Sequence, residues 1–156
     1  MLRREHERKV GALGAFSLVS NSGNNTAIAP LSVAMALQIA YNGAVGTTQQ
    51  AMAQTLRLGD LGVPQLNGDN AALQASLLDP DPKVDLTIAN SLWVHLSAHP
   101  VAPTFVSTDQ NYYGAQIGDL AGAPADVNAW VDTQTNGLIS TILPAHADYS
   151  KCGRLL

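Results

Sequence analysis

Ser32, His95 and the aspartates of the chain are, by residue type, the components of a hydrolase triad. In the common hydrolase motif the serine lies within a G-x-S-x-G turn, and the sequence around Ser32 lacks that pattern. Ser32 instead follows Pro30 at the start of an apolar run, where its hydroxyl is expected in the first turn of a helix. The sequence therefore predicts no catalytic residue, and we expect the chain not to be an enzyme.

Two histidines have the spacing of metal ligands on a helix, since His95 and His99 are four residues apart. Pro100 and the strand expected before His95 argue against a helix, and no third ligand lies nearby in the sequence. The aspartates of residues 79–85 alternate with prolines and lack the glycine of a calcium-binding loop. We expect no metal and no cofactor.

Composition limits the classes of protein that the chain can represent. Its 156 residues are 46% hydrophobic and only 13% charged, which suits one domain with a core and suggests that other protein covers part of its surface. Between residues 10 and 150 the only cations are Arg57 and Lys83, so nucleic-acid binding is not expected. No apolar stretch is long enough to span a membrane. The lone Cys152 excludes an internal disulfide.

The helical pattern is clearest after Pro30, a residue that suits the first turn of a helix. Residues 31–41 are apolar on almost every side, which predicts a helix buried all round that ends near Asn42 and Gly43. Thr47, with Gln50 three residues later, predicts the capped start of a second helix that runs to Arg57.

Further helices are predicted with weaker patterns. The weaker patterns predict the end of a helix at 10–20, a turn at 21–25, a loop at 59–68, and helices at 70–78 and 105–112. A last helix is expected to begin with Asp126 as its N-cap, with Asn136-Gly137 as an interruption or a stop.

Strands are expected at two places. Residues 84–94 alternate with period two, which predicts a strand with one apolar face, and 114–120 predicts a weaker strand. Asn90 falls on the apolar face, so a polar amide is expected to point into the core. A buried amide needs hydrogen-bond partners or costs a few kcal/mol.

Three stretches of the sequence carry a family resemblance. The first is Asn25 to Leu37 (NTAIAPLSVAMAL) followed by Tyr41 to Thr48, the second is Ile88 to Val94 (IANSLWV), and the third is Tyr112 to Ala115 with Asn128 to Ile139. In residues, order and spacing they resemble the serpin (serine protease inhibitor) family, and the resemblance covers roughly Phe16 to Leu143.

The resemblance implies an α+β fold, the N-terminal part of a serpin, in which several helices pack on part of a mixed β-sheet. Residues 30–42 would form the helix under the main sheet, 84–94 and 114–120 two of its strands, and 126–138 the helix across its front. The expected organisation is an N-terminal segment at 1–15, a partial serpin-like domain at 16–143, and a non-matching tail at 144–156.

The resemblance also implies inhibition of serine-type endopeptidases, with a serine protease of unspecified identity as partner. The family's reactive loop is absent from these residues, so we expect the chain as written not to trap a protease. The alternatives are an interaction or structural piece that pairs, or self-associates, through open sheet edges, and a non-functional gene fragment. The family suggests an extracellular location, although Glu5 and Glu7 disagree with a signal peptide.

Particular residues carry the resemblance. Ala29 stands where the family usually has a serine. A serine there would cap the buried helix and stabilise it by about 1 kcal/mol. The residues implied in sheet opening are Ala29, Ser32 and Asn90, and those of the motif core are Pro30, Asn128, Trp130, Thr135 and Gly137.

Overall fold

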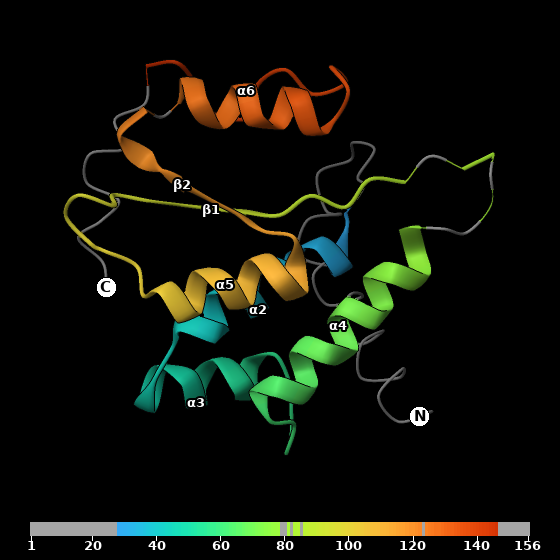
Figure 1. Ribbon diagram of the computed structural model, residues 1–156, viewed down its shortest axis with the longest axis vertical. Coiled ribbons are helices and arrows are strands. Elements are labelled where there is room, and N and C mark those ends of the chain that lie inside the picture. The colour runs from blue at the N-terminus through green and yellow to red at the C-terminus, as the bar shows by residue number, and fades with distance from the viewer. Residues whose placement is uncertain (1–27, 79–80, 82, 85, 123, 147–156) are drawn as a thin grey trace, which may run out of the picture. The chain divides into compact units, whose positions relative to one another are not determined.

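The computed structural model describes residues 28–78, 81, 83–84, 86–122 and 124–146. The chain divides into two compact units, residues 1–61 and 62–156. Figure 1 labels the helices and strands of both. The helix end expected at 10–20 and the turn at 21–25 lie outside the described residues.

The first unit contains helix α2 (Pro30–Gly43) and helix α3 (Gly46–Thr55). Pro30 occupies the first turn of α2, and the Ala44 N–H donates to the Tyr41 carbonyl at 3.1 Å where the helix ends. Both predicted ends of α2 are therefore confirmed. They depend on local residues, a proline at the start and Asn42-Gly43 at the end.

The burial of α2 differs from the expectation of a helix covered on all sides. Met35, Ile39 and Tyr41 are buried, whereas Val33 is 59% exposed and Leu37 is 42% exposed. Within the described part of the first unit α3 is the one helix that packs on α2. The prediction of a wholly buried helix was wrong for this structure, because an apolar surface is covered only where another element lies against it.

Helix α3 begins at Gly46 rather than at a Thr47 cap. Its N-cap is Val45, and no side chain makes a capping hydrogen bond. Gly46 has a φ of +59°, a conformation that glycine adopts without steric cost, and this turn sets the start of the helix. The predicted capping box was therefore wrong, and α3 ends at Thr55, just before the expected Arg57.

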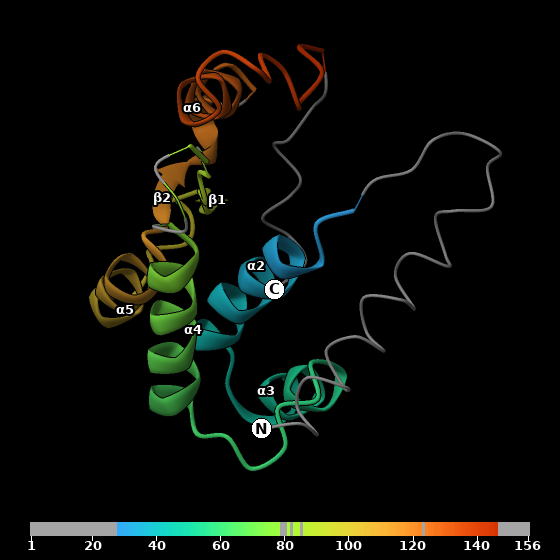
Figure 2. The same ribbon diagram turned by 90° about the vertical axis from the view of Figure 1, so that its right-hand side faces the viewer.

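The second unit contains three α-helices, one short 3₁₀ turn and two strands among its described residues. In chain order they are α4 (Val63–Leu78), β1 (Ser91–Val94), α5 (Pro103–Tyr113), β2 (Gln116–Asp119), η2 (Leu120–Gly122) and α6 (Ala125–Gln134). Figures 1 and 2 show α6 on one side of the two strands and α5 on the other. Helices combined with a small sheet confirm the predicted α+β class.

The strands pair in parallel, with Ser91 opposite Gln116 and Val94 opposite Asp119. The expected strand at 84–94 was too long, since only Ser91–Val94 is paired. Period-two alternation shows which side chains share a face, but a ladder extends only as far as its partner. Because β2 also has four residues, Val84 and Leu86 stay outside the ladder and are 54% and 42% exposed.

Helix α4 begins at Val63, so the loop expected at 59–68 and the helix start expected at Asn70 were wrong. The reason is tertiary: buried amides on α4 bond to α5. The Tyr113 hydroxyl donates to Asn67 Oδ1 at 2.8 Å and accepts from Asn70 Nδ2 at 3.1 Å. Gln74 Nε2 donates to the Tyr112 carbonyl at 3.0 Å. We call these contacts the α4–α5 clasp.

Replacing Tyr113 by phenylalanine tests the clasp. Tyr113 is 1% exposed, and loss of its hydroxyl leaves the bonding atoms of Asn67 and Asn70 without that partner. We expect the free energy of unfolding in urea to fall by about 1–3 kcal/mol. The matched control is Tyr112→Phe, whose side chain is 39% exposed, with an expected change within about 0.5 kcal/mol. Equal effects of the two changes would contradict the clasp.

Candidate functional site

The outer edge of β1 presents backbone groups that no described strand pairs, since the sheet has the order β1-β2. The Gln116 N–H donates to the Asn90 carbonyl at 2.9 Å, so the backbone of Asn90 faces β2. Because successive residues of a strand alternate, Leu92 and Val94 also face β2, whereas Ser91 and Trp93 direct their N–H and C=O groups to the other edge. We call this the free edge of β1.

Asn90 lies directly before the first residue of β1 and is 6% exposed, which confirms the expectation that its amide points inward. Its Nδ2 is buried and has no hydrogen-bond acceptor among the described residues. A buried donor without a partner costs about 1–3 kcal/mol. A cost of this size at the start of the free edge indicates a position where an acceptor from outside the described residues would stabilise the chain.

A tryptophan pair connects β1 to α6 on one face of the sheet. The Trp93 and Trp130 ring centroids are 6.4 Å apart and the ring planes meet at 73°, an edge-to-face contact. The Trp93 ring lies directly over Gly118 of β2, in the space that a Cβ would fill, and Trp93 Nε1 donates to Ser91 Oγ at 2.9 Å. The lack of a side chain at Gly118 therefore lets the Trp93 ring of the sheet lie where it contacts Trp130 of α6.

Asn128 of α6 holds the chain that follows the helix. Its Oδ1 accepts from the backbone N–H groups of Ile142 and Leu143, both at 2.9 Å, and its Nδ2 donates to the Leu143 carbonyl at 2.9 Å. Thr135 Oγ1 accepts from the Ile139 N–H at 3.0 Å. These two motif residues thus give an irregular segment a fixed path back along α6.

The ends of α6 differ slightly from the expected ones. Its N-cap position is Pro124, so the predicted cap at Asp126 was wrong, and Asp126 lies in the first turn, where its charge favours the helix dipole. The helix stops at Gln134, and Asn136 and Gly137 have positive φ values of 51° and 79°. Of the two expectations for Asn136-Gly137, an interruption or a stop, the structure shows the stop, so the helix end at 138 implied by the resemblance was wrong.

Ala29, Pro30 and Ser32 lie at the start of α2, in the first unit, apart in sequence from Asn90 in the second. Ala29 occupies the N-cap position without a side-chain cap bond, as expected for alanine, and Pro30 lies in the first turn. Ser32 is exposed. The residues of the predicted sheet-opening site thus fall in both units, and their role in sheet opening stays a prediction.

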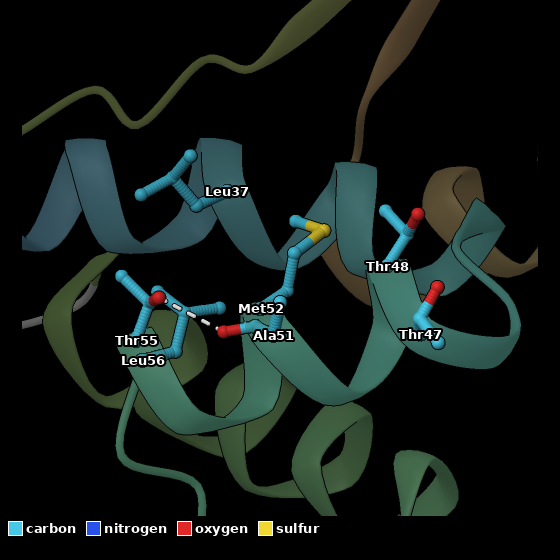
Figure 3. A pocket seen from close by; sticks show the side chains of 7 residues that line it. All are labelled: Leu37, Thr47, Thr48, Ala51, Met52, Thr55 and Leu56. Carbon is cyan, nitrogen blue, oxygen red and sulfur yellow. Dashed lines mark hydrogen bonds between the residues drawn. The ribbon is translucent and has the colours of Figure 1, made fainter.

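The first unit has a groove of about 510 Å³ between α2 and α3 (Figure 3). Figure 3 shows Met52 reaching from α3 toward α2, and the Thr55 hydroxyl is occupied by a 2.8 Å bond to the Ala51 carbonyl. The residues that line the groove are Leu37, Thr47, Thr48, Ala51, Met52, Thr55 and Leu56. No carboxylate, imidazole, thiol or amine lies in this lining, so the groove is an apolar surface without groups for acid–base chemistry.

The described residues also bear on metals and membranes. His95 and His99 lie in one turn, in which the His99 N–H donates to the His95 carbonyl at 2.8 Å. No cluster of three or more His, Cys, Asp or Glu suited to a metal ion occurs in the described part of the chain. Among the described helices, none has the length and apolarity needed to cross a membrane.

Two short parallel strands flanked by helices define the class as α+β, and comparison with known proteins gives the family. The family model described as Serpin (serine protease inhibitor) matches residues 12–152. The chain belongs to the serpin family.

Two curated relatives illustrate the match. Serpin-Z2A of Triticum aestivum is 32% identical over 154 residues, covering 90% of this chain and 37% of the relative. The leukocyte elastase inhibitor of Bos taurus is 30% identical over 129 residues, covering 79% of this chain and 33% of the relative. The chain spans about a third of the length of the curated relatives it matches.

Solved structures agree on the fold. Arabidopsis AtSerpin1 in its native stressed conformation has a TM-score of 0.74 at 22% identity, over 89% of this chain and 38% of that one. The thermophilic serpin Tengpin is 31% identical in both of its solved states. Its latent state gives a TM-score of 0.70 over 81% of this chain and 36% of that one, and its native state 0.69 over 83% and 34%.

Replacing Gly118 by alanine tests the aromatic contact. The added Cβ would overlap the Trp93 ring, so Trp93 must move relative to Trp130. We expect the free energy of unfolding to fall by about 1–3 kcal/mol and the tryptophan fluorescence to change. The control is Gly68→Ala in α4, where a Cβ meets nothing within 4 Å and the change should be neutral or stabilising. Unchanged fluorescence in Gly118→Ala would show that Trp93 does not lie over this glycine.

Proposed function

We propose that the chain forms the N-terminal part of a serpin-type inhibitor of serine endopeptidases, and that these 156 residues alone do not trap a protease. The observation that carries the proposal is the free edge of β1. Asn90, whose buried Nδ2 has no hydrogen-bond partner among the described residues, directly precedes the first residue of this strand. A strand laid along this edge would pair with Ser91 and Trp93, and one acceptor from it would satisfy Asn90.

The relatives supply the expected partner class. The bovine relative is named an inhibitor of leukocyte elastase, and the family model is described as a serine protease inhibitor. Under this proposal the chain is not an enzyme, because its role is to provide scaffold rather than reacting groups.

The similarity to Tengpin supports a scaffold role. The TM-scores to its native and latent states are nearly equal, 0.69 and 0.70, so this portion of the fold resembles both states to the same degree. The exposed apolar face of α2, with Val33 59% exposed, also suits a helix that other parts of the fold cover. On this account the residues that change between states lie elsewhere in the full fold.

The second candidate is an interaction piece that pairs, or self-associates, through the free edge. An unpaired edge strand is a template for another chain. One similar structure, 32% identical, was solved as a loop C-sheet serpin polymer. Sedimentation distinguishes this candidate, because it requires association of the chain with itself in the absence of any second piece.

Complementation tests the proposal. The 156-residue chain is mixed with a polypeptide that corresponds to the unmatched remainder of Serpin-Z2A, and sedimentation measures their association. We expect a one-to-one complex, and no detergent-stable adduct between the chain alone and trypsin-, chymotrypsin- or subtilisin-like proteases. An adduct with the chain alone would overturn the statement that these residues do not trap a protease, and no association with the second piece would overturn the scaffold role.

Asn90→Leu sharpens the same test, because its two effects have opposite signs. It removes an unpaired buried donor, so the chain alone should gain about 1 kcal/mol in the free energy of unfolding. The complex should weaken about tenfold, since the acceptor that meets Asn90 would then lack a donor. The control is Gln65→Leu, an exposed amide on α4 that should change neither value. If Asn90→Leu leaves the affinity of the complex unchanged, the second piece does not bind along the free edge of β1.

A further inference from the structure

Asparagine directly followed by glycine occurs three times in the sequence, at Asn42-Gly43, Asn67-Gly68 and Asn136-Gly137. In such a pair the backbone nitrogen of the glycine can attack the side-chain amide carbon of the asparagine, and glycine has no side chain to hinder the approach. The attack needs a glycine nitrogen that leaves its own hydrogen bond and an asparagine side chain that is free to turn. The surroundings of the three pairs therefore decide which of them reacts.

The pair Asn136-Gly137 forms the exposed turn that follows α6. The φ values are 51° for Asn136 and 79° for Gly137, in the left-handed region that asparagine tolerates and glycine adopts freely. Within residues 124–146 the Asn136 side chain makes no hydrogen bond, and a Cβ placed on Gly137 would meet nothing within 4 Å. The space around the two reacting groups is therefore open.

The attacking nitrogen of Gly137 is held by a bond at the end of a helix. The Gly137 N–H donates to the Asp132 carbonyl at 2.8 Å and closes the last turn of α6. Bonds at helix ends open at a much lower free energy than bonds in a helix interior. Opening this one turn is thus enough to release the nitrogen.

The pair Asn67-Gly68 is held far more firmly, because it lies inside α4. Asn67 is 2% exposed, and its Oδ1 accepts from the Tyr113 hydroxyl at 2.8 Å. The amide that would react is therefore part of the α4–α5 clasp, and its release requires the helix interior and the clasp to open together. The pair Asn42-Gly43 also lies within a helix, in the last turn of α2, and Asn42 is half-buried.

We propose that Asn136-Gly137 is a self-modification site at which the folded chain loses the Asn136 amide without an enzyme. The Gly137 nitrogen gives up its proton and forms a bond to Cγ of Asn136. The bond from Cγ to the amide nitrogen breaks, and ammonia leaves with that proton. Water then opens the resulting succinimide ring at either of its carbonyl carbons, which leaves an aspartate or an isoaspartate in the turn.

Either product should weaken the end of α6. Both place a negative charge beside the negative end of the helix dipole, and isoaspartate also adds a carbon to the backbone of the turn. The Gly137 N–H bond to the Asp132 carbonyl crosses the changed residue, and so does the Ile139 N–H bond to Thr135 Oγ1 at 3.0 Å. The anchor that Asn128 provides lies beyond the turn and should stay in place. This inference does not depend on the proposed function.

Ageing of the folded chain tests the site. The chain is held at neutral pH, and peptide mapping by mass spectrometry measures the conversion of amide to acid at each Asn-Gly pair. We expect Asn136 to convert at least about tenfold faster than Asn67, and the two rates to become comparable in urea that unfolds the chain. A rate at Asn42 or Asn67 that equals or exceeds the rate at Asn136 in the folded chain overturns the proposal, as does a ratio that urea leaves unchanged.

Asn136→Gly is the control variant, because glycine keeps the positive φ of the turn and has no amide to lose. The early release of ammonia should disappear in this variant, and release that persists overturns the proposal.

Hydrogen exchange on the converted chain tests the effect on α6. The amides of Gly137 and Ile139 should lose protection, whereas those of Ile142 and Leu143, which Asn128 Oδ1 holds, should keep theirs. Unchanged exchange at Gly137 and Ile139 in the converted chain overturns the second half of the inference.

Discussion

The parallel ladder between β1 and β2 is the constraint on which the second unit depends. Its register places Trp93 opposite Gly118, and the missing side chain at that glycine leaves room for the indole ring. The same ring then meets Trp130, which connects α6 to the sheet. A shift of the ladder by one residue would reverse the facing of every side chain, so Trp93 would leave α6 and Asn90 would leave the interior.

The ladder also leaves an edge of β1 that no strand among the described residues pairs. A two-stranded sheet is marginal in water unless helices or further strands cover it. Here α6 packs on one face of the sheet through the tryptophan pair, while the free edge and the unpaired Nδ2 of Asn90 remain. In the first unit, α2 shows a similar feature, because its apolar residues Val33 and Leu37 are 59% and 42% exposed. Both features agree with a chain that matches about a third of its serpin relatives.

Sequence reasoning succeeded where the determinants were local. Pro30 and Asn42-Gly43 define α2, and Asn136-Gly137 ends α6, because proline and positive-φ residues act on their own backbone. It failed where the determinants were distant. The start of α4 depends on amides that bond to a tyrosine more than forty residues away, and the length of β1 depends on how many residues β2 offers.

The candidate site divides in the same way. The alternation along residues 84–94 was enough to predict that the Asn90 side chain is buried. No sequence pattern could predict that its Nδ2 lacks a hydrogen-bond acceptor among the described residues, because that depends on which groups surround it in space. Gly118 carried no sequence signal, because its importance comes from the Trp93 ring that lies over it. The amides of Asn67, Asn70 and Gln74 did carry a sequence signal. Their spacing puts them on one face of a helix, which would have indicated a polar contact surface on α4.

Residue-resolved hydrogen exchange on β1 tests the free edge most directly, in the monomeric chain and again with the remaining part of a serpin added. The account predicts that Leu92 and Val94, which face β2, exchange slowly from the start, while Ser91 and Trp93 exchange fast and become protected only in the complex. Slow exchange of Ser91 and Trp93 in the monomeric chain alone would contradict the account, because it would mean that the outer edge of β1 is already paired.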